Sequence, residues 1–195
     1  MVRYRFVLMT ALVHVSVWGC GSEDTTSPNA TAAFEGQMTS YPDGPYGDEV
    51  GDVIENTTLT TGTDESVSLQ SLHQDPTRHL MLIFGTAGWC GRCRIHMPTL
   101  KAIYEELGSQ GVYVALSIHE NRVFGPAEPR DALNFRRLHQ LPFPVFADTD
   151  GHLTQYYNEV SIPMVMVVDL RTMVLLYAEH VWEPDDVRAL LETHL

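Results

Sequence analysis

The stretch "HLMLIFGTAGWCGRC", residues 79–93, decides how this chain folds. It joins a continuous apolar run over 79–85 to a tryptophan and two cysteines, Cys90 and Cys93. An apolar run bounded by glycine is typical of a strand that is buried on both faces. An amphipathic segment follows as far as Leu107 and predicts a helix that begins at about 91 or 93. Both cysteines are therefore expected just past a buried strand, where a helix starts.

The remaining sequence predicts further strands that alternate with helices. Short alternating stretches around Gly62 indicate a hairpin, and Pro98 is expected to kink the helix that contains it. The other predicted strands cover 112–118, 143–148, 164–169 and 173–179, and the other predicted helices cover 130–141, 151–158 and 184–195. This order indicates an α/β fold with a central mixed β-sheet flanked by helices, in which the last two strands are antiparallel.

The composition excludes one class of function and limits the role of the cysteines. The chain has 195 residues and a formal net charge of −13, whereas nucleic-acid binding needs a basic face. Its three cysteines are too few for a disulfide scaffold. Because Cys20 is remote from Cys90 and Cys93, we expect two separate roles for cysteine.

The N-terminal residues 1–19 have the pattern of a secretory signal. Arg3 and Arg5 precede an apolar run over 6–17 that is too short to cross a bilayer, and Gly19 is followed at once by Cys20. The arrangement resembles a bacterial lipoprotein signal, which implies that Cys20 is lipidated and anchors the protein to a membrane. An ordinary signal peptide or an uncleaved anchor are the alternatives. All three place the protein outside the cytoplasm, on the periplasmic side of the cell envelope.

The segment 20–47 is rich in Ser, Thr, Gly, Pro and acidic residues and has no hydrophobic period. Such a composition buries too little apolar surface to offset the entropy of ordering. We expect a flexible acidic tether here and a single folded domain over 48–195.

The position of the cysteine pair suits redox chemistry. Unsatisfied N–H groups at a helix N-terminus favour a thiolate, and only the thiolate attacks a disulfide. We expect Cys90 to be the nucleophile and Cys93 to resolve the mixed disulfide. Gly91 and Arg92 lie between them and are expected to modulate the pair, because the charge of Arg92 favours the thiolate.

Other interpretations of the pair stay open at this point. Half of a zinc site would need two further ligands, and no second CxxC is present. An inert disulfide would close so short a loop that it stabilises little. A chance pair in a core helix is the third alternative. Under the redox interpretation the chain needs no metal and no cofactor besides the Cys90–Cys93 disulfide itself.

Four segments together resemble the thioredoxin-like superfamily, in particular the exported TlpA/ResA-type redoxins. They are "WCGRC" with Pro98 behind it, "VSIPMVMVVD", "VGDVIENTTLTTGTDESVSLQSL" and "LPFPVFADTDG". The resemblance implies a thioredoxin fold with an N-terminal β-hairpin and an inserted helix and strand between the central strands. It also implies a cis peptide bond between Ile162 and Pro163, and contact with the substrate through Trp89, Ile162 and Pro163.

The resemblance further implies a thiol-disulfide oxidoreductase that acts on protein thiols and disulfides in the cell envelope, such as apocytochrome c or a copper-site protein. A membrane thiol reductant would be its electron donor. Two other functions remain open. A peroxiredoxin-like peroxidase would need Pro and Thr where this chain has Ile83 and Ala87. A copper metallochaperone would use the thiolates of Cys90 and Cys93 and a nearby histidine as ligands.

The chain departs from the thioredoxin pattern in two respects. The strand over 79–85 has no acidic residue, and Arg92 replaces the proline that is common between the cysteines. Because Arg92 favours the thiolate and therefore the reduced form, we expect a pair more oxidising than that of thioredoxin. Glu159 is a weaker candidate for handling protons.

Overall fold

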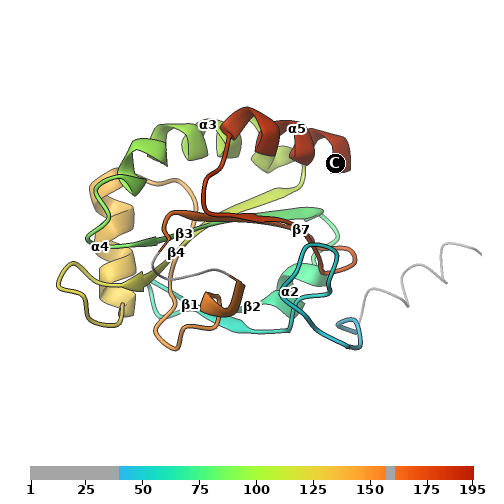
Figure 1. The fold of residues 1–195 in the computed structure, drawn as a ribbon, viewed down its shortest axis with the longest axis horizontal. Helices are drawn as coiled ribbons and strands as arrows, with labels where there is room; N and C mark the ends of the chain where they lie inside the picture. The colour runs from blue at the N-terminus through green and yellow to red at the C-terminus, as the bar shows by residue number, and fades with distance from the viewer. Residues whose placement is uncertain (1–39, 157–160) are drawn as a thin grey trace, which may run out of the picture.

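A computed structural model describes residues 40–156 and 161–195 of the chain. The signal, Cys20, the first part of the tether and Glu159 lie outside the described residues. Within them, seven strands form one mixed sheet in the order β2-β1-β5-β4-β3-β6-β7 (Figure 1). The strands are β1 Thr58–Thr61, β2 Ser66–Ser68, β3 Leu80–Ala87, β4 Val112–Glu120, β5 Val145–Ala147, β6 Met164–Asp169 and β7 Val174–Glu179.

The helices lie between these strands and after them. The α-helices are α2 Leu69–His73, α3 Met97–Leu107, α4 Pro129–His139 and α5 Pro184–His194, and the 3₁₀ helices are η1 Cys93–His96, η2 Gly108–Gln110 and η3 Thr154–Tyr156. Among the described residues, no helix combines the length and the hydropathy that a bilayer span requires.

The strand β3 lies in the interior of the sheet and is buried along its whole length. It pairs in parallel with β4 and antiparallel with β6. Leu82 and Phe84 belong to the core on one face, whereas Met81 and Ile83 belong to the core on the other. Because successive side chains of a strand point to opposite faces, a strand covered on both sides has to be apolar throughout.

Helices cover both faces of the sheet. Leu100 of α3, Phe135 of α4 and Leu191 of α5 pack into one core, and Leu69 of α2 and Tyr156 of η3 pack into the other (Figure 1). The predicted α/β thioredoxin fold is confirmed, including the N-terminal hairpin of β1 and β2 and the inserted α4 and β5 between β4 and β6.

The start of the active-site helix differs from the prediction. Residues Cys93–His96 form the 3₁₀ helix η1, and α3 begins at Met97 with Pro98 in its first turn. A proline is tolerated there because its missing N–H would have no partner within the helix. The predicted kink at Pro98 is therefore wrong.

Contacts with the domain begin before Asp48, where the sequence predicted its start. The Tyr41 hydroxyl donates to the carbonyl oxygen of Ile54 at 2.8 Å, and a ring nitrogen of His73 lies 3.2 Å from the carbonyl oxygen of Ser40. The segment 40–47 was assigned to the tether from its composition. Its first residues, Ser40 and Tyr41, instead pack against α2 and the core that contains Leu69.

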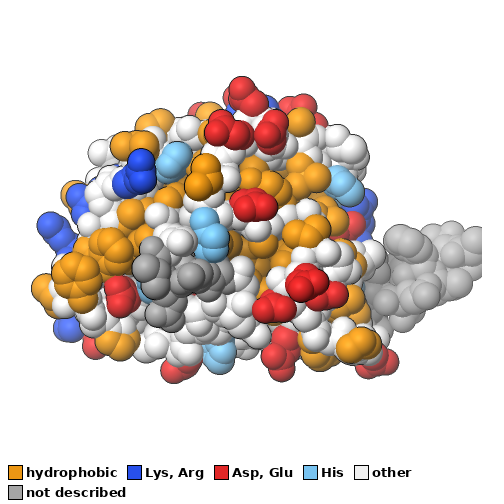
Figure 2. Space-filling view, viewed as in Figure 1, with side chains coloured by type: hydrophobic (Ala, Val, Ile, Leu, Met, Phe, Trp, Pro, Cys, Tyr) orange, Lys and Arg blue, Asp and Glu red, His pale blue; other side chains and the backbone are white. Residues whose placement is uncertain are grey.

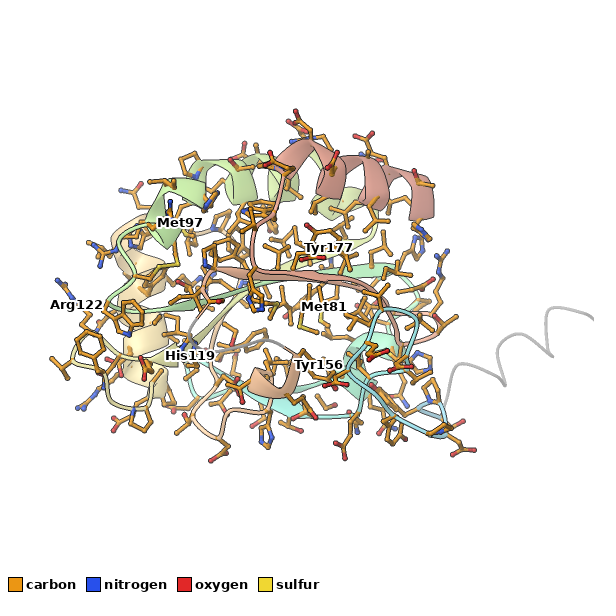
Figure 3. The ribbon with its side chains drawn as sticks, viewed as in Figure 1. Met81, Met97, His119, Arg122, Tyr156 and Tyr177 are labelled. Carbon is orange, nitrogen blue, oxygen red and sulfur yellow. A yellow bond between two sulfur atoms is a disulfide. The ribbon has the colours of Figure 1, made fainter. Side chains whose placement is uncertain are left out.

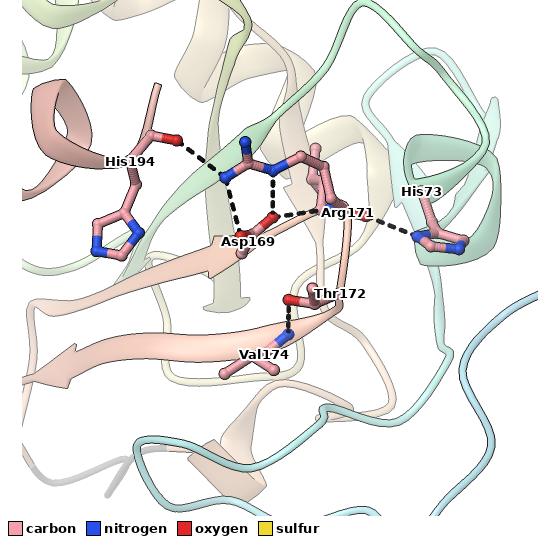
Figure 4. A network of polar contacts seen from close by, with 7 residues as sticks. His73, Asp169, Arg171, Thr172, Val174 and His194 are labelled. Atoms are coloured by element: carbon pink, nitrogen blue, oxygen red, sulfur yellow. Dashed lines mark hydrogen bonds and ion pairs between the residues drawn. The ribbon is translucent and has the colours of Figure 1, made fainter. Parts of the chain in front are cut away.

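A polar network closes the end of the sheet where β3 begins (Figure 4). The Arg171 guanidinium donates to both carboxylate oxygens of Asp169 and to the carbonyl oxygen of His194, at 2.9–3.0 Å. The buried His73 ring lies 2.6 Å from the carbonyl oxygen of Leu170. These contacts join α2, the β6–β7 turn and the end of α5.

Candidate active site

The two cysteines form a disulfide at the opposite end of β3. Their sulfur atoms are 2.04 Å apart, and the Cα–Cα distance is 5.4 Å. Cys90 follows the tight turn after β3, where its N–H donates to the carbonyl oxygen of Ala87, and Cys93 is the first residue of η1. Cys90 is 5% exposed and Cys93 is fully buried. The sulfur nearer the surface is thus the one expected to attack.

The backbone of η1 favours negative charge on Cys90. The N–H of Cys93 donates to Cys90 Sγ at 3.1 Å. The first N–H groups of a helix have no partner within it, so a sulfur in this position receives a hydrogen bond and the partial positive charge of the helix end. The exposed Arg92 adds a full positive charge between the two cysteines. Both effects stabilise a thiolate on Cys90.

The segment around Pro163 lies beside the end of β3. The Ile162–Pro163 peptide bond is cis, as the resemblance implied. Met164 pairs with Gly85 in the antiparallel β3–β6 register, so Pro163 comes next to Thr86 at the edge of the sheet where the dithiol lies. Pro163 is buried and Ile162 is half-buried. This edge therefore brings together the two segments that the sequence singled out.

Trp89 is directed toward the loop that follows β4. Its Nε1–H donates to a carboxylate oxygen of Glu120 at 2.6 Å, and its ring stacks on Phe124 with centroids 5.3 Å apart. The turn passes close to this loop at Gly88, where an added Cβ would lie 3.0 Å from the backbone nitrogen of Arg122. Trp89 remains 36% exposed, so it forms part of the surface beside the dithiol.

His96, the last residue of η1, is half-buried. Its Nδ1 accepts a hydrogen bond from Trp182 Nε1–H at 3.2 Å, and its ring packs against Phe84 at a centroid distance of 5.8 Å. Burial lowers the pKa of His96, and the charge of Arg92 lowers it further. Because Trp182 is remote in sequence, periodicity could not predict this contact. An imidazole with a lowered pKa therefore lies three residues after Cys93.

A buried carboxylate that the sequence analysis missed lies at the same edge of the sheet. Asp148 follows β5, and its two oxygens accept from the backbone N–H groups of His152 and Leu153 at 2.8 and 3.0 Å. Burial raises the pKa of Asp148, although the hydrogen bonds and the nearby His119 oppose this shift. The strand β3 thus contains no acidic residue, but the acidic residue Asp148 follows β5, which is separated from β3 by β4.

The described part of the chain holds no group of three or more His, Cys, Asp or Glu residues that could bind a metal ion. The two further ligands that a zinc site would need are therefore not found beside Cys90 and Cys93 in residues 40–156 and 161–195. In the structure the two cysteines are instead bonded to each other.

Comparison with known proteins agrees with this geometry. The AhpC/TSA family matches residues 50–179, which span the sheet from the hairpin to β7. The chain belongs to the AhpC/TSA family. No curated protein matches it significantly. As a member of this family with a CxxC disulfide at the end of β3, the chain is a thioredoxin-like oxidoreductase.

Solved structures of the same fold include several thiol-disulfide oxidoreductases. A putative thiol:disulfide interchange protein DsbE from Chlorobium tepidum shares 23% identity at a TM-score of 0.58, covering 75% of this chain and 95% of that one. An exposed lipoprotein thioredoxin from Streptococcus pneumoniae has 19% sequence identity and a TM-score of 0.52, and the match covers 71% of this chain and 99% of that one. A secreted disulfide oxidoreductase from Mycobacterium tuberculosis has 14% sequence identity and a TM-score of 0.53, and the match covers 70% of this chain and 95% of that one.

The charge at Arg92 leads to a prediction about the reduction potential. We expect a potential above about −270 mV, the value for thioredoxin. The variant Arg92→Gln should lower it by roughly 5–20 mV, because an exposed charge contributes about 0.2–1 kcal/mol. Equilibration with glutathione buffers measures both values, with Arg137→Gln on α4 as the control for charge at a distance. A potential below that of thioredoxin, or no change in Arg92→Gln, contradicts the role assigned to Arg92.

Proposed function

We propose that this protein is an exported, membrane-tethered thiol-disulfide oxidoreductase that reduces or exchanges disulfides in proteins of the cell envelope. Cys90 is the attacking residue and Cys93 the resolving residue. The observation that carries the proposal is the hydrogen bond from Cys93 N–H to Cys90 Sγ. The same two residues are joined by a disulfide, so Cys93 is close enough to resolve a mixed disulfide on Cys90. It supports a thiolate on the more accessible of the two sulfurs.

The reaction proceeds through a mixed disulfide. The Cys90 thiolate of the reduced protein attacks one sulfur of the substrate disulfide, a Cys90–substrate S–S bond forms, and the other substrate sulfur leaves as a thiolate and takes a proton. Cys93 then attacks Cys90 Sγ and releases the second substrate thiol. Two electrons pass to the substrate, and the Cys90–Cys93 disulfide remains. A thiol donor, proposed to be a membrane reductant, restores the dithiol.

The substrate chain is proposed to lie between Trp89 and the Ile162–Pro163 segment. Both flank the end of β3, and Trp89 and Ile162 retain exposed surface there. The backbone that precedes Pro163 can exchange hydrogen bonds with an extended polypeptide while the disulfide of that polypeptide reaches Cys90. This arrangement supports protein substrates, among which apocytochrome c and copper-site proteins remain candidates.

Replacing the resolving cysteine should trap the substrate. In Cys93→Ser the mixed disulfide on Cys90 has no intramolecular thiol to break it, so covalent complexes should accumulate in cells. Non-reducing electrophoresis and mass spectrometry identify the trapped proteins. The double variant Cys90→Ser/Cys93→Ser is the matched control and should trap none. If Cys93→Ser forms no dithiothreitol-sensitive complexes, Cys90 is not the attacking residue.

Export and lipidation are proposed from the N-terminal sequence, since Cys20 lies outside the described residues. The arginines, the short apolar run and the Gly19–Cys20 pair support a lipoprotein signal. A secreted protein and an exposed lipoprotein among the structures of similar fold agree with this proposal.

The Cys20→Ser variant should lose its lipid and its membrane attachment. Cells that express the full chain are labelled with radioactive palmitate and fractionated. We expect label and membrane association in the unchanged protein and in Cys90→Ser, and neither in Cys20→Ser. Label that persists in Cys20→Ser would show that this residue is not the lipidation site.

A peroxidase is the second candidate, because the matching family is described as AhpC/TSA. In that reaction Cys90 would attack a peroxide and Cys93 would then form the disulfide, with water as the product. The fully buried Ile83 and Ala87 stand where peroxidases of this type have Pro and Thr, so no hydroxyl is offered from position 87. Parallel assays with insulin and hydrogen peroxide distinguish the two acceptors.

A further inference from the structure

The loop over 121–126, between β4 and α4, exposes two apolar side chains beside the dithiol. Val123 is 81% exposed and Phe124 is 69% exposed. The Phe124 ring stacks on the ring of Trp89, the residue that directly precedes Cys90. Large apolar side chains that gather at the surface of a protein are typical of an interaction site. The surface formed by Trp89, Val123 and Phe124 is called the aromatic platform below.

Hydrogen bonds hold this loop in one shape. The side-chain oxygen of Asn121 accepts from the N–H groups of Val123 and Gly125 at 2.9 and 3.0 Å. The side-chain nitrogen of Asn121 donates to the carbonyl oxygen of Pro126 at 3.2 Å. The backbone N–H of Asn121 donates to the carbonyl oxygen of Gly125 at 2.8 Å. A surface that is ordered before its partner arrives loses less entropy on binding, so the aromatic platform is suited to recognition.

The backbone of Phe124 is in the left-handed region, with a φ of 62°. A bulky side chain rarely adopts this conformation, whereas glycine adopts it without a steric penalty. The positive φ nevertheless falls on Phe124, although Gly125 follows it directly. Strained residues of this kind cluster at sites of function. Because the ring is so exposed and contributes little to the core, contact with a partner explains its position better than packing does.

Charges of both signs surround the aromatic platform. Arg92, between the cysteines, and Arg122, in the loop itself, are both exposed. Phe124 also lines an open pocket whose acidic residues are Glu120, Asp148 and Asp150. Figure 2 shows hydrophobic side chains exposed among basic and acidic ones at the end of the molecule where α4 lies, and Figure 3 shows Arg122 at this end. Charge therefore favours no one sign of partner here, and the apolar side chains are left to select it.

The position of the platform indicates which part of a substrate reaches it. The substrate disulfide has to reach Cys90, so the residues that flank the substrate cysteine pass Trp89. Successive side chains of an extended chain point to opposite sides, and the side chain two residues from the cysteine therefore faces the protein, roughly 7 Å along the chain. We propose that the aromatic platform selects extended polypeptides with a large apolar side chain two residues from a cysteine. This inference rests on the proposed function and names the substrates of the same dithiol.

The inference also defines the folding state of the substrates. Cysteine and the large apolar residues are among the residues that folded proteins bury most often. A segment that offers both to a partner is therefore one that has not folded. The substrates are disulfides in unfolded segments, rather than disulfides at the surface of folded domains.

The test compares two peptides that differ only near their cysteine. One has phenylalanine two residues before and two residues after the cysteine, and the other has serine at both positions. In each peptide the cysteine forms a disulfide with 2-nitro-5-thiobenzoate. The Cys90 thiolate of the reduced protein attacks the peptide sulfur, a Cys90–peptide S–S bond forms, and the coloured thiolate leaves. Its absorbance gives the rate constant, and reaction with glutathione corrects for the intrinsic reactivity of each peptide.

We expect the phenylalanine peptide to react about tenfold faster than the serine peptide, because its rings lose contact with water on the platform. In Phe124→Ser this ratio should fall to about twofold. Val50→Ser is the matched control. It removes an apolar side chain that is 62% exposed beside the edge strand β7, and the ratio should stay at about tenfold.

The outcomes separate this inference from the proposed function. Equal rates for the two peptides, an unchanged ratio in Phe124→Ser, or an equal fall in Val50→Ser overturns the inference. The oxidoreductase proposal then stands, because Cys90 has attacked both peptides. If the reduced protein reacts with neither peptide faster than glutathione does, the oxidoreductase proposal fails and this inference fails with it.

Discussion

The variant Cys90→Ser should lose at least about a hundredfold in the rate of insulin reduction with dithiothreitol as the electron donor. A serine hydroxyl stays protonated at neutral pH and does not attack a disulfide, whereas the thiolate does. The hydrogen bond from Cys93 N–H, 3.1 Å from Cys90 Sγ, would then reach an oxygen that cannot carry out the exchange. Turbidity of the precipitating insulin B chain measures the rate above the background of dithiothreitol alone.

Two comparisons make this result specific. Cys20→Ser leaves the domain unchanged and should keep the full rate, and circular dichroism should show that Cys90→Ser is folded. In a parallel assay hydrogen peroxide is supplied as the electron acceptor. The unchanged protein should consume peroxide no faster than Cys90→Ser does. Rapid peroxide consumption without insulin reduction would instead favour the peroxidase. Insulin reduction by Cys90→Ser above background would remove Cys90 from the mechanism.

The variant Phe84→Ala should lower the free energy of unfolding by about 3–5 kcal/mol. Phe84 is fully buried in β3 and packs against the rings of His96 and Trp182, so its loss leaves a cavity beneath η1. Because Trp182 donates to His96 across this contact, the change should also loosen the residues that follow the dithiol. Urea denaturation followed by tryptophan fluorescence measures the loss.

An exposed aromatic residue is the matched control. Phe124→Ala removes a ring that is 69% exposed and should cost less than about 1 kcal/mol. If Phe84→Ala were no more destabilising than Phe124→Ala, the packing of Phe84 against His96 and Trp182 would be wrong.

The sequence predicted the sheet well because burial on both faces leaves a strong local pattern. The apolar run over 79–85 is the buried strand β3, and the runs over 112–118 and 164–169 are its neighbours β4 and β6. Helix α2 was missed because its five residues are too few to establish a period. The wrong kink at Pro98 came from placing the start of the α-helix too early, since η1 takes up the first turn.

The site was predictable only where its residues are close in sequence. Cys90 and Cys93 lie within one motif, and their bonding distance follows from that spacing. The cis bond before Pro163 came from resemblance, because most such bonds are trans. The contact of His96 with Trp182, the buried Asp148 and the stack of Trp89 on Phe124 join residues far apart in sequence. No local pattern could indicate these contacts.

The polar contacts between Ser40, His73 and Leu170 have a consequence for orientation. Leu170 follows the end of β6 that lies beside the start of β3, so the chain enters the domain at the pole opposite the dithiol. The eight residues of β3 separate the two poles by about 25 Å. An anchor upstream of Ser40 would be attached at the rear of the domain, so that the end of the sheet with the two cysteines would be the end farther from the point of attachment.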